Sequence, residues 1–122
     1  MKKKILVVDD SPVVLAMIED MLSELNYDVT VAENGFDASR QVEQQRFNLI
    51  ITDLNMPVMS GIEFAKKAKL IPNCRFVPIV MLSSENDQDK IAEAKKMGIS
   101  TFLSKPIKEN QLKALLQVVM GS

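Results

Sequence analysis

The chain has 122 residues, of which 47% are hydrophobic and 25% charged, and its formal net charge is -1. This size and balance are typical of one globular domain with an ordinary core, and they give no electrostatic reason to expect nucleic acid binding. The chain has no histidine and a single cysteine, Cys74, which excludes Ser-His-Asp and Cys-His catalysis, His-ligated zinc, multi-cysteine metal sites and an internal disulfide.

The first expected elements are a buried strand at residues 4–8 and a helix behind it. The strand is apolar without interruption after its first residue, as in a central strand covered on both faces. Ser11 suits a helix N-cap and Pro12 the first helical position, and apolar residues then recur every three or four positions up to Leu25. The apolar run is shorter than the roughly 7–15 residues of a signal peptide, so we expect a cytoplasmic protein.

The same alternation of strand and helix continues to the end of the chain. The sequence predicts strands at residues 27–32, 48–52, 76–82 and 100–103, and helices at residues 35–44, 60–70, 86–97 and 108–119. This pattern predicts an α/β fold with a doubly wound five-stranded parallel sheet, right-handed crossovers and helices on both faces. In such sheets the ligand site lies beyond the carboxyl ends of the strands.

Polar side chains follow four of the predicted strands where each strand ends. These residues are Asp9 and Asp10, then Asp53, then Ser83, Ser84 and Glu85, and finally Lys105. If the sheet is doubly wound, they converge on one edge. Three of these residues also have a simpler structural interpretation. Asp53 can begin a solvated turn, Ser83 can cap a helix, and Lys105 can be a surface lysine.

Three converging carboxylates repel one another, and a hard divalent cation removes that conflict. Mg²⁺ suits the site because it accepts one or two carboxylates and keeps several waters. Lys105 adds a fixed positive charge and Ser83 a hydroxyl. A nucleophilic carboxylate, a metal, a cation and a hydroxyl are together the parts needed to receive a phosphoryl group.

Four motifs, "VVDDS", "ITDLNMPVMSG", "VMLSS" and "FLSKPI", lie at these strand ends. In this order and spacing the sequence resembles the response-regulator receiver domain of bacterial two-component signalling, similar to single-domain chemotaxis regulators. The resemblance covers residues 5–119. It implies one receiver domain over residues 1–122, with a (βα)5 flavodoxin-like fold and strand order 2-1-3-4-5.

The resemblance also implies roles for the acidic residues and their neighbours. Asp53 resembles the phosphoacceptor, which takes a phosphoryl group from a phosphohistidine. Asp10 is expected to ligate Mg²⁺ directly and Asp9 through a metal-bound water, and Asp53 and the backbone carbonyl of Asn55 complete the expected ligand set. Asn55 and Glu85 occupy positions that tune dephosphorylation in this family.

The remaining implied roles concern the phosphate and the response to it. Lys105 is expected to pair with the phosphate, and the peptide bond before Pro106 is expected to be cis. Ser83 matches the hydroxyl that moves onto the phosphate, and Phe102 matches the aromatic switch residue that follows it.

Several residues near the site are interpreted from their chemistry alone. Pro57 can fix the loop after Asp53, and Gly61 permits either a close approach or an unusual dihedral. Met56 and Met59 lie in that loop as possible exceptions to a general role of methionine as core filler. The charge-rich segment 87–96 is expected to be a solvated helix face.

The expected partners are a sensor histidine kinase or phosphotransfer protein and a downstream target on the face formed by the fourth helix, fifth strand and fifth helix. We expect no nucleic acid or membrane partner, and we expect a monomer unless the protein is phosphorylated.

Three alternative functions remain. The first is a haloacid-dehalogenase-type phosphatase, which needs an acid where Asn55 stands. The other two are a binding module without the phosphorylation chemistry and the input half of a longer DNA-binding regulator. A stand-alone phosphoacceptor that catalyses only its own phosphorylation and dephosphorylation is favoured, because no linker follows residue 119.

Overall fold

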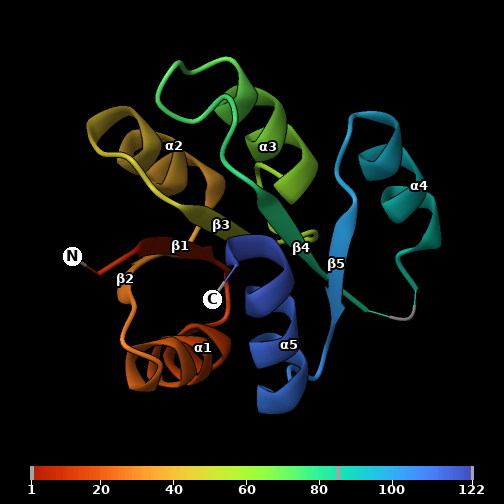
Figure 1. Ribbon diagram of the computed structural model, residues 1–122. Helices are drawn as coiled ribbons and strands as arrows, with labels where there is room; N and C mark the ends of the chain where they lie inside the picture. The colour runs from red at the N-terminus through yellow and green to blue at the C-terminus, as the bar shows by residue number, and fades with distance from the viewer. Residues whose placement is uncertain (1, 85, 122) are drawn as a thin grey trace.

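The computed structural model of the protein describes residues 2–84 and 86–121. Five strands alternate with five helices along the described chain (Figure 1). The strands are β1 (Lys4–Val8), β2 (Asp28–Ala32), β3 (Leu49–Asp53), β4 (Ile79–Ser83) and β5 (Thr101–Ser104). The helices are α1 (Pro12–Glu24), α2 (Gly35–Gln44), α3 (Gly61–Lys69), α4 (Gln88–Lys96) and α5 (Glu109–Met120).

The strands form one parallel sheet in the order β2-β1-β3-β4-β5. The register places Leu6 of β1 opposite Thr30 of β2 and Ile50 of β3. At the carboxyl end, Asp53 is opposite Leu82, and Ser83 is opposite Ser104. The predicted doubly wound fold and its strand order are therefore confirmed.

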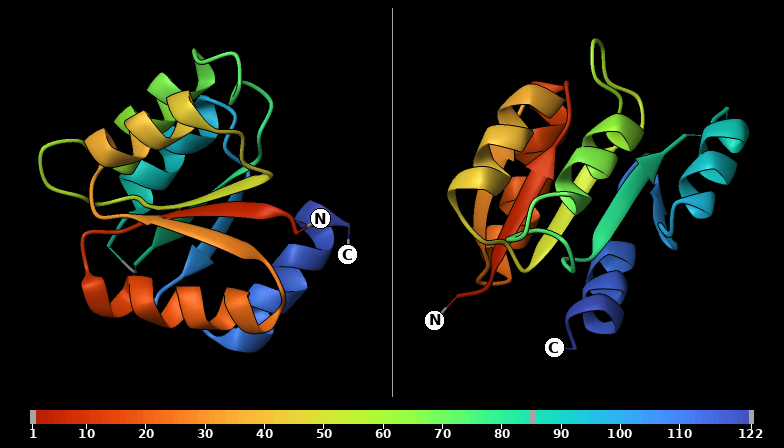
Figure 2. Two further views of the ribbon diagram at one scale, coloured as in Figure 1. Left: turned by 90° about the vertical axis from the view of Figure 1, so that its left-hand side faces the viewer. Right: turned by 90° about the horizontal axis from the view of Figure 1, so that it is seen from above.

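Helices cover both faces of the sheet, α1 and α5 on one face and α2, α3 and α4 on the other (Figures 1 and 2). Successive residues of a strand point to opposite faces, so each central strand supplies both cores. Leu6 and Ile50 belong to the core beneath α2 and α3, whereas Ile5 and Ile51 belong to the core beneath α1 and α5. This explains why these strands read as unbroken apolar runs.

The helix starts follow local capping chemistry. Ser11 Oγ accepts a hydrogen bond from Val14 N at 3.3 Å, and Pro12 is the first residue of α1. Ser60 and Glu63 form a capping box at the start of α3.

Most predicted bounds of the helices and strands agree with the structure to within one or two residues. This difference is the usual uncertainty of helix and strand ends.

The predicted start of the fourth strand at Phe76 is wrong, since β4 begins at Ile79. Val77 N donates to Cys74 O at 3.2 Å, which makes this segment a turn. Pro78 has no amide hydrogen to add to the sheet, and Phe76 is 90% exposed. The apolar letters before Pro78 thus belong to a surface loop.

None of the helices in the described part of the chain is long and apolar enough to cross a membrane.

Candidate functional site

The carboxyl ends of β1, β3, β4 and β5 bring the predicted polar residues to one edge of the sheet. Asp9 follows β1, Asp53 ends β3, Ser83 ends β4 and Lys105 follows β5. One carboxylate oxygen from each of Asp9, Asp10 and Asp53 lies within 4.8 Å of the others. Asp9 and Asp53 are 0% and 5% exposed, whereas Asp10 is exposed. The predicted acidic cluster therefore exists as a three-dimensional site.

Lys105 bridges the two buried carboxylates. Its Nζ lies 3.0 Å from Asp9 Oδ2 and 3.2 Å from Asp53 Oδ2. The Lys105 backbone N donates to Ser83 O at 2.8 Å, which ties the end of β5 to the end of β4. The peptide bond between Lys105 and Pro106 is cis. The lysine is thus held where it faces both acids.

The electrostatics of the site reflect buried like charges with one counter-charge. Burial raises the pKa of Asp53 above its ordinary value of 3.8, and the charge of Asp9 raises it further, while Lys105 and the N–H of Asn55 act in the opposite direction. Burial alone would lower the pKa of Lys105, but the close contacts of its ammonium group with the negative charges of Asp9 and Asp53 outweigh this effect, so the pKa of Lys105 is raised above 10.5. The site retains excess negative charge that a cation can offset.

The donor set fits a magnesium ion. Asp9 Oδ1 accepts a hydrogen bond from Ser11 N at 2.9 Å. Asp9 Oδ2 lies within ion-pair distance of Lys105 but accepts no hydrogen bond of good geometry from the residues that the structure describes. A buried carboxylate oxygen without such a partner is an unusual feature. Asp9, Asp10 and Asp53 together offer the hard oxygen ligands that Mg²⁺ prefers.

The loop after Asp53 is held close to the strand end. Asn55 N donates to Asp53 Oδ1 at 3.3 Å. Gly61 begins α3 beneath this loop, and a Cβ at Gly61 would lie 2.1 Å from the backbone oxygen of Asp53. Of the two reasons considered for a glycine here, the structure supports the close approach, because Gly61 has no positive φ.

The rest of this loop forms a tight turn over the core. Met59 N donates to Pro57 O at 2.8 Å, and Val58 between them has a φ of 71°. A left-handed conformation is unfavourable for a β-branched residue, so this exposed turn is strained. Met56 and Met59 are 9% and 5% exposed and join the core, which places them with the other core methionines.

Ser83 and Phe102 lie on neighbouring strands near the site. Ser83 is 4% exposed at the end of β4. Phe102 of β5 is half-buried and packs against the core beneath α2 and α3. Lys95 Nζ of α4 lies 5.9 Å from the centroid of its ring. Their switch roles stay predictions, and the expected tuning residue Glu85 lies outside the described residues.

The sequence interpretation missed Asp87, which was assigned to a solvated helix face but is 6% exposed. Its Oδ1 accepts a hydrogen bond from Asn55 Nδ2 at 2.7 Å, and its Oδ2 accepts from Ser84 N at 2.7 Å and Ser84 Oγ at 3.0 Å. Burial alone would raise the pKa of Asp87, but these hydrogen bonds and the charge of Lys90 lower it. The Ser-x-x-Asp spacing of Ser84 and Asp87, a capping-box signature, was the available signal.

Comparisons with known proteins extend over nearly the whole chain. A family model described as "Response regulator receiver domain" matches residues 5–117. The chain is 36% identical over 121 residues to the Chemotaxis protein CheY1 of Helicobacter pylori, with 98% of each chain covered. The resemblance predicted from the strand-end motifs is thereby confirmed.

The solved structures with the same fold include two that match this chain over nearly its full length. The chemotaxis protein CheY4 of Vibrio cholerae matches with a TM-score of 0.92 and 37% identity, over 98% of this chain and 99% of that chain. The receiver domain of the sensor histidine kinase PA1611 from Pseudomonas aeruginosa matches with a TM-score of 0.89 and 34% identity over the full length of both chains. The latter structure has a magnesium ion coordinated in its active site cleft.

Proposed function

This chain belongs to the response regulator receiver domain family of two-component signalling, and from that premise we propose that it is a switch operated by phosphorylation of Asp53. The observation that carries the proposal is the setting of this carboxylate. It is 5% exposed at the end of a buried strand, and it lies 3.2 Å from Lys105 Nζ beside two further acids. Burying these like charges opposes folding, so a chemical role accounts for them better than a structural one.

The proposed reaction is transfer from a phosphohistidine on a sensor kinase or phosphotransfer protein. An oxygen of Asp53 attacks phosphorus, the new O–P bond forms as the P–N bond breaks, and the histidine nitrogen keeps the electron pair and takes up a proton. Lys105 offsets the charge on the phosphoryl oxygens. β3 is a buried strand that holds the Asp53 carboxylate in a fixed position at its end.

Asp9, Asp10 and Asp53 are the proposed magnesium ligands, Asp10 directly and Asp9 through a water. The backbone carbonyl of Asn55 is proposed as a further ligand. When bound, Mg²⁺ supplies positive charge that permits the phosphoryl group to approach an acidic site. The support from this chain is the clustering of the three carboxylates, together with the buried oxygen of Asp9 that has an ion pair with Lys105 but accepts no hydrogen bond of good geometry from the described residues.

The proposed response begins at Ser83, whose hydroxyl turns toward the new phosphate. Phe102 then changes rotamer, and the face formed by α4, β5 and α5 shifts in population and binds a downstream target. The burial of Ser83 at the end of β4 and the position of Phe102 next to Lys95 of α4 support this route.

The proposal treats residues 1–122 as one receiver domain that acts in the cytoplasm and is a monomer until phosphorylated. In this proposal the protein catalyses only its own phosphorylation and dephosphorylation. The amide of Asn55 argues against the phosphatase alternative, because an amide cannot carry the proton that such an enzyme moves with an acid at this position.

The test is intact mass after incubation with a small phosphodonor, with and without Mg²⁺, for the wild type and Asp53→Asn. We expect one added phosphoryl group that requires both Mg²⁺ and Asp53. Asp20→Asn, at an exposed position of α1, is the matched control and should be phosphorylated like the wild type. Addition that persists in Asp53→Asn would show that another residue is the acceptor, and no addition at all would favour a binding module.

A further inference from the structure

Asp87 occupies the N-cap position of α4 but does not cap that helix. Its side chain makes no capping hydrogen bond to the first turn, although aspartate is a preferred residue there for that purpose. Among the described residues, its carboxylate accepts three hydrogen bonds, one from Asn55 and two from Ser84. A carboxylate that is 6% exposed and turned away from its own helix needs another explanation.

Both polar atoms of the Asn55 side chain form hydrogen bonds with residues at the start of α4. Asn55 Nδ2 donates to Asp87 Oδ1 at 2.7 Å, and Asn55 Oδ1 accepts a hydrogen bond from Lys90 Nζ. These contacts cross from the loop after β3 to the start of α4, over 32 and 35 positions of sequence. The side chain of Asn55 is therefore bonded to residues at the start of α4, while its backbone N donates to Asp53 Oδ1 in the acidic site.

Asp87 contacts a neighbour of Asp53 and a neighbour of Ser83, the two residues on which the proposed chemistry depends. On one side, Asn55 N donates to Asp53 Oδ1 at 3.3 Å. On the other side, Asp87 holds both the backbone N and the hydroxyl of Ser84, the residue next to Ser83. One buried carboxylate thus connects the loop after the phosphoacceptor to the segment after the switch serine.

We propose that Asp87 is a positioning residue of the phosphorylation site. It anchors the Asn55 side chain, and this anchoring holds the Asn55 backbone beside Asp53. The loop is then already in the position in which the site binds a divalent cation. A loop whose residues are fixed in advance loses less conformational entropy on binding than a free one. The inference rests on the proposed function, because it concerns the Mg²⁺ site of that function.

The test is a double-mutant cycle on Mg²⁺ affinity, measured by calorimetry on the whole chain. Asp87→Ala removes the anchor, and Asn55→Ala removes the anchored amide while keeping the backbone carbonyl and every charge. We expect each single variant to bind Mg²⁺ about five-fold more weakly, and the double variant to bind no more weakly than the single ones, since each single variant already removes the hydrogen bond between Asn55 and Asp87. Asp89→Ala, at an exposed position of the same helix, removes the same charge and should retain wild-type affinity.

A second measurement separates positioning from stability. Thermal unfolding of each variant is recorded with a chelator and with saturating Mg²⁺, and the rise in Tm caused by the ion is compared. Positioning predicts a smaller rise in Asp87→Ala and Asn55→Ala. An overall lower Tm with the wild-type rise would show a structural role alone and would overturn the inference.

Other outcomes are equally decisive. Wild-type affinity in Asn55→Ala together with weaker binding in Asp87→Ala would mean that the charge of Asp87 matters and not its contact with Asn55. Failure of the wild type to bind Mg²⁺ or accept a phosphoryl group would overturn the proposed function and this inference with it. If the wild type does both and the variants match its affinity, only the positioning role is wrong.

Discussion

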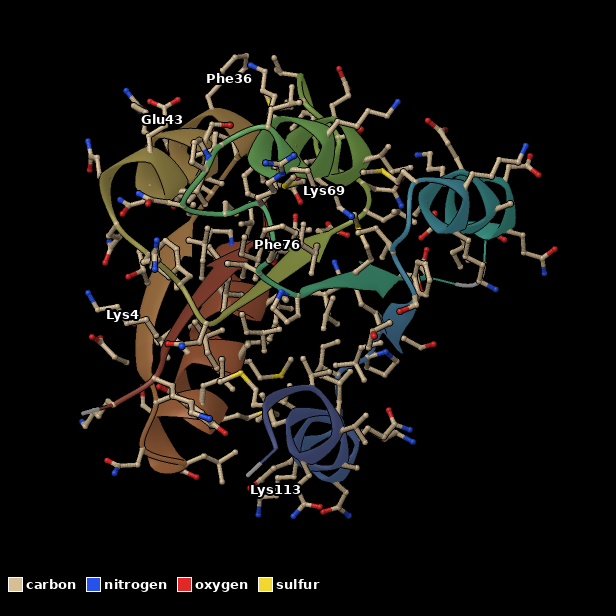
Figure 3. All side chains as sticks on the ribbon, turned by 45° about the horizontal axis from the view of Figure 1, so that its top comes forward. Lys4, Phe36, Glu43, Lys69, Phe76 and Lys113 are labelled. Carbon is tan, nitrogen blue, oxygen red and sulfur yellow. The ribbon has the colours of Figure 1, made fainter. Side chains whose placement is uncertain are left out.

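At the carboxyl end of the sheet the chain buries several charged and hydroxyl side chains, whereas polar side chains in the loops at the amino end are exposed. The buried polar side chains in the described part of the chain are Asp9, Thr52, Asp53 and Ser83, in or directly after the carboxyl ends of strands, and Asp87 at the start of α4. At the other end, Arg46, Asn48 and Arg75 are exposed. Phe76 is 90% exposed in the loop before β4 (Figure 3).

The two ends therefore differ in how much structure constrains each residue. At the carboxyl end, close backbone contacts and like charges leave little freedom, and the raised pKa of Asp53 shows that its charge is held in an unfavourable setting. At the amino end, solvent screens the exposed charges of Arg46 and Arg75. Substitutions should have large effects on stability or chemistry at the first end and small effects at the second.

The largest effect is expected for Gly61→Ala. The new Cβ would meet the Asp53 backbone oxygen at 2.1 Å, and that backbone cannot move freely because Leu54 N donates to Leu82 O. We expect a loss of about 2–4 kcal/mol in the free energy of unfolding, measured in urea, together with reduced phosphorylation by intact mass.

Gly35→Ala is the matched control for this prediction, since Gly35 is also the first residue of its helix. Its Cβ would meet the side chain of Met59, with Sδ at 2.6 Å, and a flexible side chain can move aside. We expect a clearly smaller loss of stability and normal phosphorylation. Equal losses in both variants would mean that the backbone contact at Asp53 has no special importance.

An intermediate effect of opposite sign is expected for Asp53→Asn without Mg²⁺. Because the folded-state pKa of Asp53 is raised, its ionised form destabilises the fold. The neutral variant should be more stable by about 1 kcal/mol near neutral pH. This gain should vanish as the pH falls through the folded-state pKa toward 3.8, where the wild-type carboxyl is also neutral.

Saturating Mg²⁺ should reverse that order, because an ion that binds the folded wild type stabilises it. Urea unfolding of both proteins over a pH series, with chelator and with Mg²⁺, provides the check. If Asp53→Asn is less stable than the wild type at every pH in chelator, the ion pairs with Lys105 outweigh the cost of burial.

The smallest effect is expected for Phe76→Ala at the amino end. The guanidinium of Arg75 lies 5.7 Å from the centroid of the ring, and the ring is mostly in solvent. We expect a change within about 0.5 kcal/mol in the free energy of unfolding and an unchanged extent of phosphorylation. A loss as large as that in Gly61→Ala would contradict the contrast between the two ends.

Much of the fold followed from local patterns. Unbroken apolar runs predicted the central strands, and Ser11 with Pro12 predicted the start of α1. The error at Phe76 also has a local cause, because a run of apolar letters does not reveal which of them reach the core. Pro78 marked the true boundary, since its missing amide hydrogen is unsuited to a central strand.

The amino-acid sequence by itself determined the order of the elements, the parallel sheet and the set of polar residues at the strand ends, because side-chain period, turn residues and capping residues act over a few positions. Only the tertiary structure decided which of these residues touch. The bridge of Lys105 between Asp9 and Asp53, the approach of Gly61 to the Asp53 backbone and the anchoring of Asn55 by Asp87 join separate segments of the chain. Such contacts depend on register, crossover and side-chain direction together, and no local pattern contains all three.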